Sequence, residues 1–216
     1  MERLICLIIG YVCGNFQTAY FMGKRKGIDI REHGSGNAGT TNTLRVLGRK
    51  AGIVVFLGDV FKCAVAIWIS RLLYGESHAD IIYILTLYAA LGTILGHNYP
   101  VLLGFRGGKG MACTAGLVVF YHPWLLAICV STFLIIFFTT HYVSLGSVVL
   151  YIVFVGVMTV LCFSGALGAL STIQIVELLA ISLFMAIMAI ARHWSNIKRL
   201  IKGEESKTYL SKKNRK

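Results

Sequence analysis

Four polar segments interrupt an otherwise apolar chain, and each carries residues that can hold a phosphate group. The first segment, residues 31–45, alternates glycines with serine, threonine and asparagine and ends at an arginine. Glycine lets backbone N–H groups approach a ligand closely, and the arginine fork matches phosphate oxygens. The pattern favours a phosphate site, although the same residue types mark flexible turns. The candidates are Ser35, Gly36, Asn37, Gly39, Thr41, Asn42 and Arg45.

The second segment, residues 96–110, places Gly-Gly-Lys-Gly directly before an apolar run. Backbone donors, a helix dipole and the Lys109 ammonium would converge there on an anion. The spacing does not fit a Walker A motif, and Lys109 alone could be a charge that sets membrane orientation. The candidates for phosphate binding are His97, Gly107, Gly108, Lys109 and Gly110.

The third and fourth segments are shorter and less specific. Ser144 could donate to a phosphate or cap the helix that follows it. His193 and Asn196 are three residues apart, so on a helix they share one face and could orient a polyol or move a proton. The alternative for His193 is an interfacial histidine beside the membrane-belt residue Trp194.

The composition requires a membrane around this chain. Of its 216 residues 56% are hydrophobic and only 14% are charged, well below the roughly 25% of soluble domains. The net charge is +12, and most of the 21 lysines and arginines fall in three clusters at residues 24–50, 105–110 and 192–216. Such clustering follows the rule that cations stay on the cytoplasmic side, and it does not indicate nucleic-acid binding.

The apolar runs predict an all-α integral membrane protein with seven transmembrane helices. The runs cover residues 4–22, 51–73, 80–99, 111–139, 143–163 and 172–191. Six crossings from an outside N-terminus would leave the basic C-terminus outside, so we split 111–139 at His122-Pro123, where proline breaks a helix. The C-terminus and all basic segments then face the cytoplasm. Residues 111–122 would span only about 18 Å, so we expect a short, partly shielded helix there.

The remaining features are assigned structural roles. Residues 1–203 are expected to form one catalytic domain, and 204–216 a basic tail that is disordered at its end. Asp59 and Lys62 lie deep in one span, where isolated charges are costly, so we expect them to pair. The six cysteines lie in apolar runs without metal-ligand spacing, and we expect neither a metal nor another cofactor.

Taken together, the four segments resemble one enzyme family, the bacterial glycerol-3-phosphate acyltransferases that use acyl phosphate. The resemblance rests on four motifs: Gly-Ser-Gly-Asn-x-Gly-x-Thr-Asn-x-x-Arg at 34–45, Gly-His-x-x-Pro with Gly-Gly-Lys-Gly at 96–110, Tyr-Val-Ser at 142–144, and His-x-x-Asn-Ile-Lys-Arg-Leu-x-x-Gly-Glu-Glu at 193–205. It implies a seven-helix enzyme of the bacterial inner membrane, with its site on the cytoplasmic side. That enzyme would make 1-acyl-glycerol 3-phosphate and phosphate.

The resemblance also assigns roles to individual residues. The functional positions it implies are Ser35, Asn37, Thr41, Arg45, Lys109, Ser144, His193 and Asn196, with 107–110 as the acceptor-phosphate loop. The family often has arginine at His141, Arg-Glu at Trp194-Ser195 and a proline within 15–18, so no role is carried onto those positions.

In the implied mechanism Arg45 and Lys109 neutralise two phosphates while His193 and Asn196 orient the acceptor hydroxyl. The proton acceptor stays open between His193 and a phosphate oxygen of the donor. Substrates and membrane lipids are the expected partners, and the chain is expected to be a monomer. The alternative function is a small transporter of an anionic or phosphorylated solute. An acyltransferase using coenzyme A thioesters is disfavoured because no histidine has aspartate five residues later.

Overall fold

A computed structural model describes residues 1–209 of the chain, and every regular element in that range is helical. The α-helices are α1 (Glu2–Asn15), α2 (Thr18–Lys24), α3 (Thr40–Leu47), α4 (Arg49–Tyr74), α5 (Ile82–Asn98), α6 (Met111–Tyr121), α7 (Pro123–Thr140), α8 (Val143–Phe163), α9 (Thr172–Arg192) and α10 (Trp194–Ile201). Short 3-10 helices cover Ile30–Glu32, Ala79–Ile81 and Val101–Leu103.

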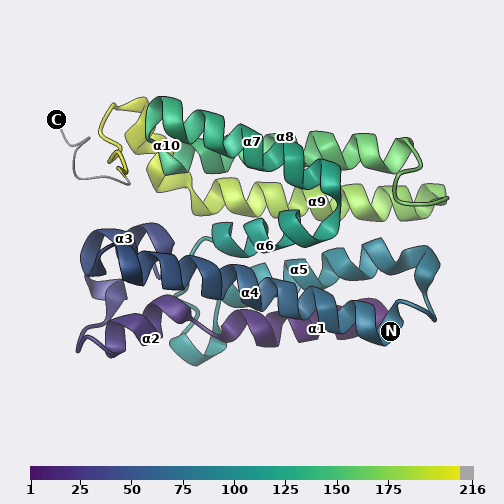
Figure 1. Ribbon diagram of the computed structural model, residues 1–216, viewed down its shortest axis with the longest axis horizontal. Coiled ribbons are helices and arrows are strands. Elements are labelled where there is room, and N and C mark those ends of the chain that lie inside the picture. The colour runs from purple at the N-terminus through teal and green to yellow at the C-terminus, as the bar shows by residue number, and fades with distance from the viewer. Residues whose placement is uncertain (210–216) are drawn as a thin grey trace.

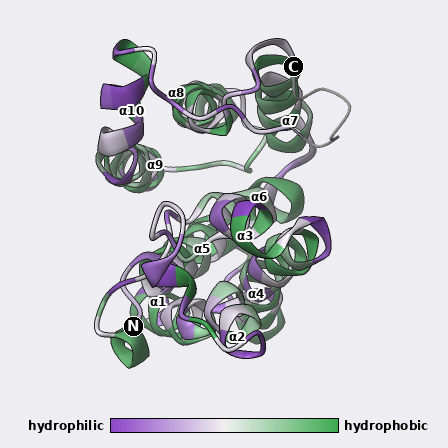
Figure 2. Ribbon diagram, turned by 90° about the vertical axis from the view of Figure 1, so that its left-hand side faces the viewer, coloured by the Kyte–Doolittle hydropathy of each residue, from purple (hydrophilic) through white to green (hydrophobic). Residues whose placement is uncertain are grey.

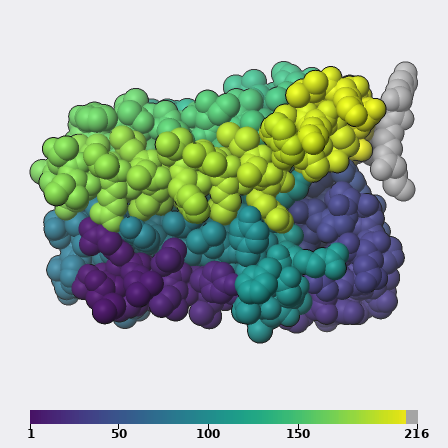
Figure 3. Space-filling model, turned by 180° about the vertical axis from the view of Figure 1, so that it is seen from behind, coloured from purple at the N-terminus to yellow at the C-terminus, as the bar shows by residue number. Residues whose placement is uncertain are grey.

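The long helices form two layers, which Figure 1 shows edge-on. The first layer holds α1 to α6, and the second holds α7 to α10. Seen from behind, α9 runs along the first layer over most of its length (Figure 3). The main hydrophobic core joins the layers, with Leu85 and Leu87 of α5 packed in the same cluster as Tyr151 and Phe154 of α8.

Within residues 1–209, six helical segments are long and apolar enough to cross a membrane. The chain is therefore a multi-pass integral membrane protein. The segment Met111–Tyr121 is apolar but has only 11 residues, as expected for the short helix between the second polar segment and His122. The predicted break is present: His122 is extended and its side chain accepts a hydrogen bond from the backbone of Trp124. The count of seven crossings and the orientation of the chain stay predictions.

One apolar run differs from its expected form. The run 4–22 was predicted as a single helix, but α1 ends at Asn15 and α2 begins at Thr18. The carbonyl groups freed by this break are held by side chains inside the protein. Gln17 donates to the carbonyl of Gly14, and Lys62 donates to those of Gly14 and Phe16. Polar side chains thus replace the missing backbone hydrogen bonds, which lipid cannot supply.

Glycines let α1 and α5 pack backbone against backbone. A Cβ added at Gly10 would collide with the carbonyl oxygen of Ala89, and one at Gly92 would collide with that of Leu7. Gly14 and Gly96 make equally close approaches one turn further along. Each helix therefore presents a Gly-x-x-x-Gly pair to the other, which is typical of helix pairs in membranes. The sequence analysis overlooked this pattern.

The polar segments gather at the end of the molecule opposite the N-terminus. Figure 1 shows α2, α3 and α10 at that end, and Figure 2 looks directly onto it. Residues 204–209 fold back there beside α10, with Glu205 and Thr208 buried. The predicted disorder of the tail concerns residues 210–216, which lie outside the described residues. The predicted domain boundary at residue 203 is not tested.

Candidate active site

A cavity of about 780 Å³ opens at this polar end. Every candidate residue from the sequence lines it except Gly108, so segments from four distant parts of the chain meet there. Its polar part is formed by residues 35–45, 107–110, 192–199 and 205–208. Its other part is apolar and lies between α4, α6, α7 and α8.

In the first loop, Asn42 organises the backbone around Ser35. The Asn42 side-chain oxygen accepts from the N–H of Ser35 at 2.8 Å, and its amide nitrogen donates to the carbonyls of Ile30 and His33. Asn42 is only 1% exposed, so these bonds make it a support for the loop. Ser35 itself is exposed at the cavity.

Arg45 reaches from α3 to the C-terminal segment. Its guanidinium donates to the carbonyl of Ser206 at 3.1 Å and to the hydroxyl of Thr208 at 3.2 Å. The predicted phosphate-binding cation is thus attached to a segment that the sequence analysis treated as a tail. Both partners are neutral, so the positive charge of Arg45 stays available to an anion.

The second loop is shaped by His97. A Cβ at Gly107 would collide with the carbonyl oxygen of His97, and one at Gly108 with the imidazole nitrogen Nε2. The Gly108 N–H donates to the His97 carbonyl at 3.1 Å. Arg192 donates to the carbonyls of Gly107 and Gly108. Because the Gly108 N–H already donates to the His97 carbonyl, the backbone donors for an anion must come from the residues next to Gly108.

A buried carboxylate, Glu205, joins the third and fourth segments. It accepts hydrogen bonds from Ser144 at 2.8 Å, Asn196 at 2.7 Å and Arg199 at 2.8 Å. Asn196 in turn accepts from the ammonium of Lys109. Of the two roles considered for Ser144, capping the helix is not observed, because its hydroxyl donates to Glu205, and donation to a phosphate stays a prediction. Glu205 was not predicted as part of the site, because its sequence position, next to Glu204 in a polar stretch, suggests an exposed acid.

His193 has the protonation pattern of a hydrogen-bond acceptor facing a substrate. Its Nδ1 lies 2.8 Å from the carbonyl oxygen of Ala189. A carbonyl can only accept, so Nδ1 carries the hydrogen and Nε2 keeps a free lone pair. Burial and the charge of Lys109 lower the pKa of His193 to about 4, so the ring is neutral near pH 7.

Lys109 and Glu205 complete the electrostatics of the polar part. Burial lowers the pKa of Lys109 to about 8, although the charge of Glu205 acts in the opposite direction. Burial alone would raise the pKa of Glu205, but hydrogen bonds from Asn196, Arg199 and Ser144 outweigh it and hold the pKa below its ordinary value. Among the described residues of the polar part, Glu205 is therefore one carboxylate among several cations, and this part favours anionic ligands.

Beneath the second loop, Asp59, His97 and Cys113 place potential metal-ligand atoms within 4.8 Å of one another. The ammonium of Lys62 lies 2.8 Å from both Asp59 and His97. A cation of the protein thus already neutralises this group, and the expected pairing of Asp59 with Lys62 is confirmed.

The family model described as glycerol-3-phosphate acyltransferase matches residues 4–203. The chain belongs to this family. The glycerol-3-phosphate acyltransferase of Alkaliphilus metalliredigens is 40% identical over 208 residues, covering 96% of each chain. That of Clostridioides difficile is 39% identical over 213 residues, covering 94% of each.

Two solved structures have the same fold. The crystal structure of PlsY, an integral membrane glycerol 3-phosphate acyltransferase, in its glycerol 3-phosphate form is 31% identical, with a TM-score of 0.81. It covers 97% of this chain and 96% of its own. Its lysophosphatidic acid form aligns with a TM-score of 0.78 over the same shares. The family resemblance drawn from the four motifs is therefore confirmed.

Proposed function

We propose that this chain transfers a fatty acyl group from acyl phosphate to glycerol 3-phosphate in the cytoplasmic membrane of a bacterium. The products would be 1-acyl-glycerol 3-phosphate and inorganic phosphate, as an early step of phospholipid synthesis. The observation that carries the proposal is the single cavity, which joins a cation-rich, glycine-lined part to an apolar part. Both substrates carry a phosphate, and the donor also carries a long hydrocarbon chain.

The apolar part suits the acyl chain. It is lined over the stretches 52–59, 111–118, 130–138 and 143–150, about two helical turns of each helix and roughly 10 Å deep at 1.5 Å per residue. Phe56 of α4 and Leu134 and Phe138 of α7 line the cavity, yet they are 41%, 43% and 61% exposed. The cavity therefore opens sideways between α4 and α7, where a chain can enter from the bilayer.

The polar part suits two phosphates. We assign the acceptor phosphate to the loop 107–110 and Lys109, and the donor phosphate to Ser35 and Arg45. Asn37 and Thr41 line the same part, and Ser144 lines the cavity where the two parts meet; all three would supply neutral contacts. Cations and hydrogen-bond donors fixed before the substrates bind stabilise the charge that develops on the donor phosphate as it leaves.

The reaction needs one nucleophilic attack and one proton transfer. The acceptor hydroxyl oxygen bonds to the acyl carbonyl carbon, and the bond from that carbon to the phosphate oxygen breaks, leaving its electron pair on phosphate. The hydroxyl proton goes to Nε2 of His193 or to a phosphate oxygen of the donor. His193→Gln and His193→Ala separate these routes. Near-normal turnover of the glutamine variant alone would make His193 a positioning residue.

The proposal includes the arrangement in the membrane. With α6 counted as a short crossing, the chain crosses seven times, its N-terminus lies outside and the cavity faces the cytoplasm. Substituted-cysteine labelling in vesicles tests this orientation, and an extracellular cysteine at residue 204 would overturn it. We also propose that the enzyme acts as a monomer.

The decisive experiment supplies purified protein in detergent with labelled glycerol 3-phosphate and one acyl donor. Acyl phosphate should give lysophosphatidic acid, and acyl-coenzyme A at the same concentration should not. Product from acyl-coenzyme A alone would overturn the donor assignment. Uptake of glycerol 3-phosphate into proteoliposomes without any acyl product would favour the transporter alternative.

A further inference from the structure

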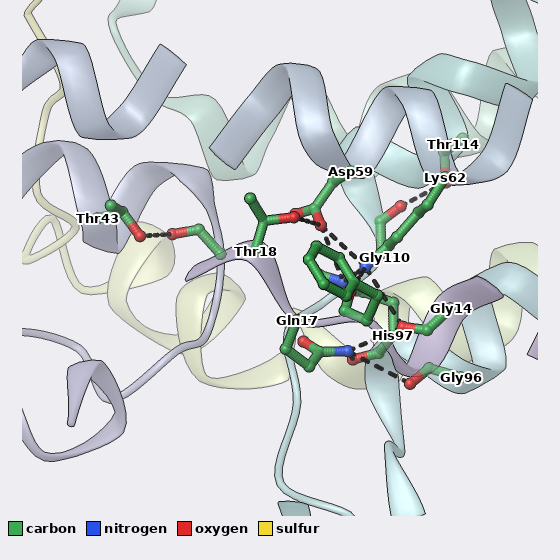
Figure 4. Close-up of polar contacts among 12 residues, drawn as sticks. Gly14, Gln17, Thr18, Thr43, Asp59, Lys62, Gly96, His97, Gly110 and Thr114 are labelled. Atoms are coloured by element: carbon green, nitrogen blue, oxygen red, sulfur yellow. Dashed lines mark hydrogen bonds and ion pairs between the residues drawn. The ribbon is translucent and has the colours of Figure 1, made fainter. Parts of the chain in front are cut away.

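A network of buried polar groups lies directly beneath the acceptor loop 107–110 (Figure 4). Its centre is the ammonium of Lys62 in α4, which lies 2.8 Å from the Asp59 carboxylate, 2.8 Å from the carbonyl of Phe16 and 2.8 Å from Nδ1 of His97. Thr18 donates to Asp59 from the start of α2. The network thus connects the break between α1 and α2, the middle of α4 and the end of α5.

These contacts determine which nitrogen of His97 carries the hydrogen. A lysine ammonium carries hydrogens but no lone pair, so it can only donate to Nδ1 of His97 at 2.8 Å. Nδ1 must therefore accept, so Nε2 carries the hydrogen. Within residues 1–209, Nε2 of His97 has no hydrogen-bond partner. It is also not one of the fully enclosed polar atoms without a partner, so part of its surface is open. His97 lines the cavity, so this N–H is available to a ligand there.

We infer that Asp59 and Lys62 are positioning residues of the acyl transfer, which act on the acceptor phosphate through His97. The pair orients the imidazole so that its Nε2–H faces Gly108 and the cavity, and the imidazole in turn supports the acceptor loop. The inference rests on the proposed function. It changes the expectation from the sequence, which favoured a purely structural pair.

The two glycines of the loop show how closely it depends on His97. Gly108 packs against the imidazole, whereas Gly107 packs against the backbone carbonyl of the same residue. The Gly108 N–H also bonds to that carbonyl, and Gln17 donates to the same oxygen at 3.3 Å. Any movement of His97 would therefore move the loop that is proposed to bind the acceptor.

The first experiment removes the charges of the pair. Replacing Lys62 alone leaves a buried carboxylate unpaired and can prevent folding, so the main variant is the double change Asp59→Asn with Lys62→Met. The purified variant should show a KM for glycerol 3-phosphate about tenfold or more above that of the parent, as expected when a hydrogen bond to a charged group is lost. Its KM for acyl phosphate should change less than about twofold.

The control is Thr93→Val on α5, one turn before His97. Thr93 is fully buried, and its hydroxyl bonds only to a carbonyl of its own helix. A structural defect of this kind should lower thermal stability without changing either KM selectively. If the double variant also changed only stability, or raised both KM values equally, the pair would have no positioning role.

A second experiment tests the imidazole itself. In His97→Gln an amide N–H can take the place of Nε2–H, whereas in His97→Asn the amide reaches only the position of Nδ1. The glutamine variant should keep the KM for glycerol 3-phosphate within about threefold of the parent, and the asparagine variant should lose about tenfold. Equal KM values for the two variants would contradict the inference, even if the charge variant did not fold.

A double-mutant cycle then tests the packing of the loop. In a His97→Ala background the ring that a methyl group at position 108 would meet most closely is gone, although the carbonyl oxygen of Ala38 remains near it. Gly108→Ala should therefore raise the KM for the acceptor less than it does in the parent. Gly107→Ala is the matched control, because it meets the backbone of residue 97, which remains. If Gly108→Ala raised the KM for the acceptor equally in both backgrounds, the imidazole would not support the loop.

The outcomes distinguish the two levels of the proposal. A parent protein that makes no lysophosphatidic acid from acyl phosphate and glycerol 3-phosphate overturns the proposed function. An active parent whose double variant keeps its acceptor KM overturns only the role of Asp59 and Lys62.

Discussion

Helix α5 of the first layer and helix α7 of the second differ in how much of each is buried. In the first layer, 67% of the α5 span is buried and its glycines touch the backbone of α1, whereas in the second layer only 17% of α7 is buried. The first layer carries the loops 34–45 and 107–110, and the second supplies His193 and much of the apolar wall of the cavity. Rigid packing therefore underlies the proposed phosphate site, while the looser wall faces the lipid from which the acyl chain would come.

The largest effect is expected for His193, which the second layer contributes to the cavity. His193→Ala removes the free lone pair of Nε2, and kcat should fall by about 10²–10⁴-fold, the usual contribution of a positioned acid or base. The measurement is the steady-state rate of lysophosphatidic acid formation. Trp194→Leu is the control, because this neighbour is 56% exposed and does not line the cavity. Equal losses in both variants would indicate a general disturbance of α10.

The second prediction tests the close packing of α5 against α1 by adding a methyl group there and, for comparison, on α8. Gly92→Ala places a methyl group against the backbone of α1, so the free energy of unfolding should fall by about 1–3 kcal/mol or more. Gly156→Ala on α8 has no described neighbour within 4 Å and should stabilise the helix by about 0.4–1 kcal/mol. Thermal unfolding in one detergent compares the two variants. Similar midpoints would mean that the layers tolerate added volume equally.

The third prediction concerns the carboxylate of Glu205, which joins Ser144 to Asn196. Glu205→Gln keeps an oxygen for Ser144 but removes the charge that balances Arg199, so kcat/KM should fall about tenfold. Glu204→Gln changes an exposed neighbour and should have little effect. The measurement is the kcat/KM of the two purified variants. Equal losses of kcat/KM would contradict a specific role for Glu205.

The smallest effect is a pH dependence at the junction of the layers, where Lys109 of the first layer meets Asn196 of the second. With a pKa of about 8, Lys109 is charged below that value and loses its charge as the pH rises through it. Between pH 7 and pH 9 the KM for glycerol 3-phosphate should therefore rise about threefold. His193, with a pKa of about 4, stays neutral throughout. Lys109→Met should flatten the profile, and an unchanged slope in that variant would assign the effect elsewhere.

The sequence predicted the membrane fold well because its physical signals are local. Apolar runs, the proline after His122 and the clustered cations each act within one helix length. The break at residues 16–17 was missed because nothing within the run itself stops a helix there. Two side chains make the break tolerable by donating to the freed carbonyls. Gln17 donates to Gly14, and Lys62, from the separate helix α4, donates to Phe16.

The site was predicted to the extent that its residues carry recognisable chemistry. Glycine-rich loops, Lys109 and His193 were found, and they line one cavity. Glu205 was missed because its burial depends on three donors from two helices, α8 and α10, a contact that no spacing reveals. For Asn42 the sequence could not show that its side chain supports the loop, and its predicted contact with a ligand stays a prediction. Its amide looks suited to a ligand, but the loop itself uses all of its hydrogen bonds.

The position of Glu205 in the chain has a consequence for biosynthesis. A ribosome feeding this protein into the bilayer completes every long helix before it reaches the residue that joins Ser144, Asn196 and Arg199. All the long helices of the described chain are thus synthesised before the contacts of Glu205 can form. Prematurely terminated copies would occupy the membrane without consuming the precursors of that membrane.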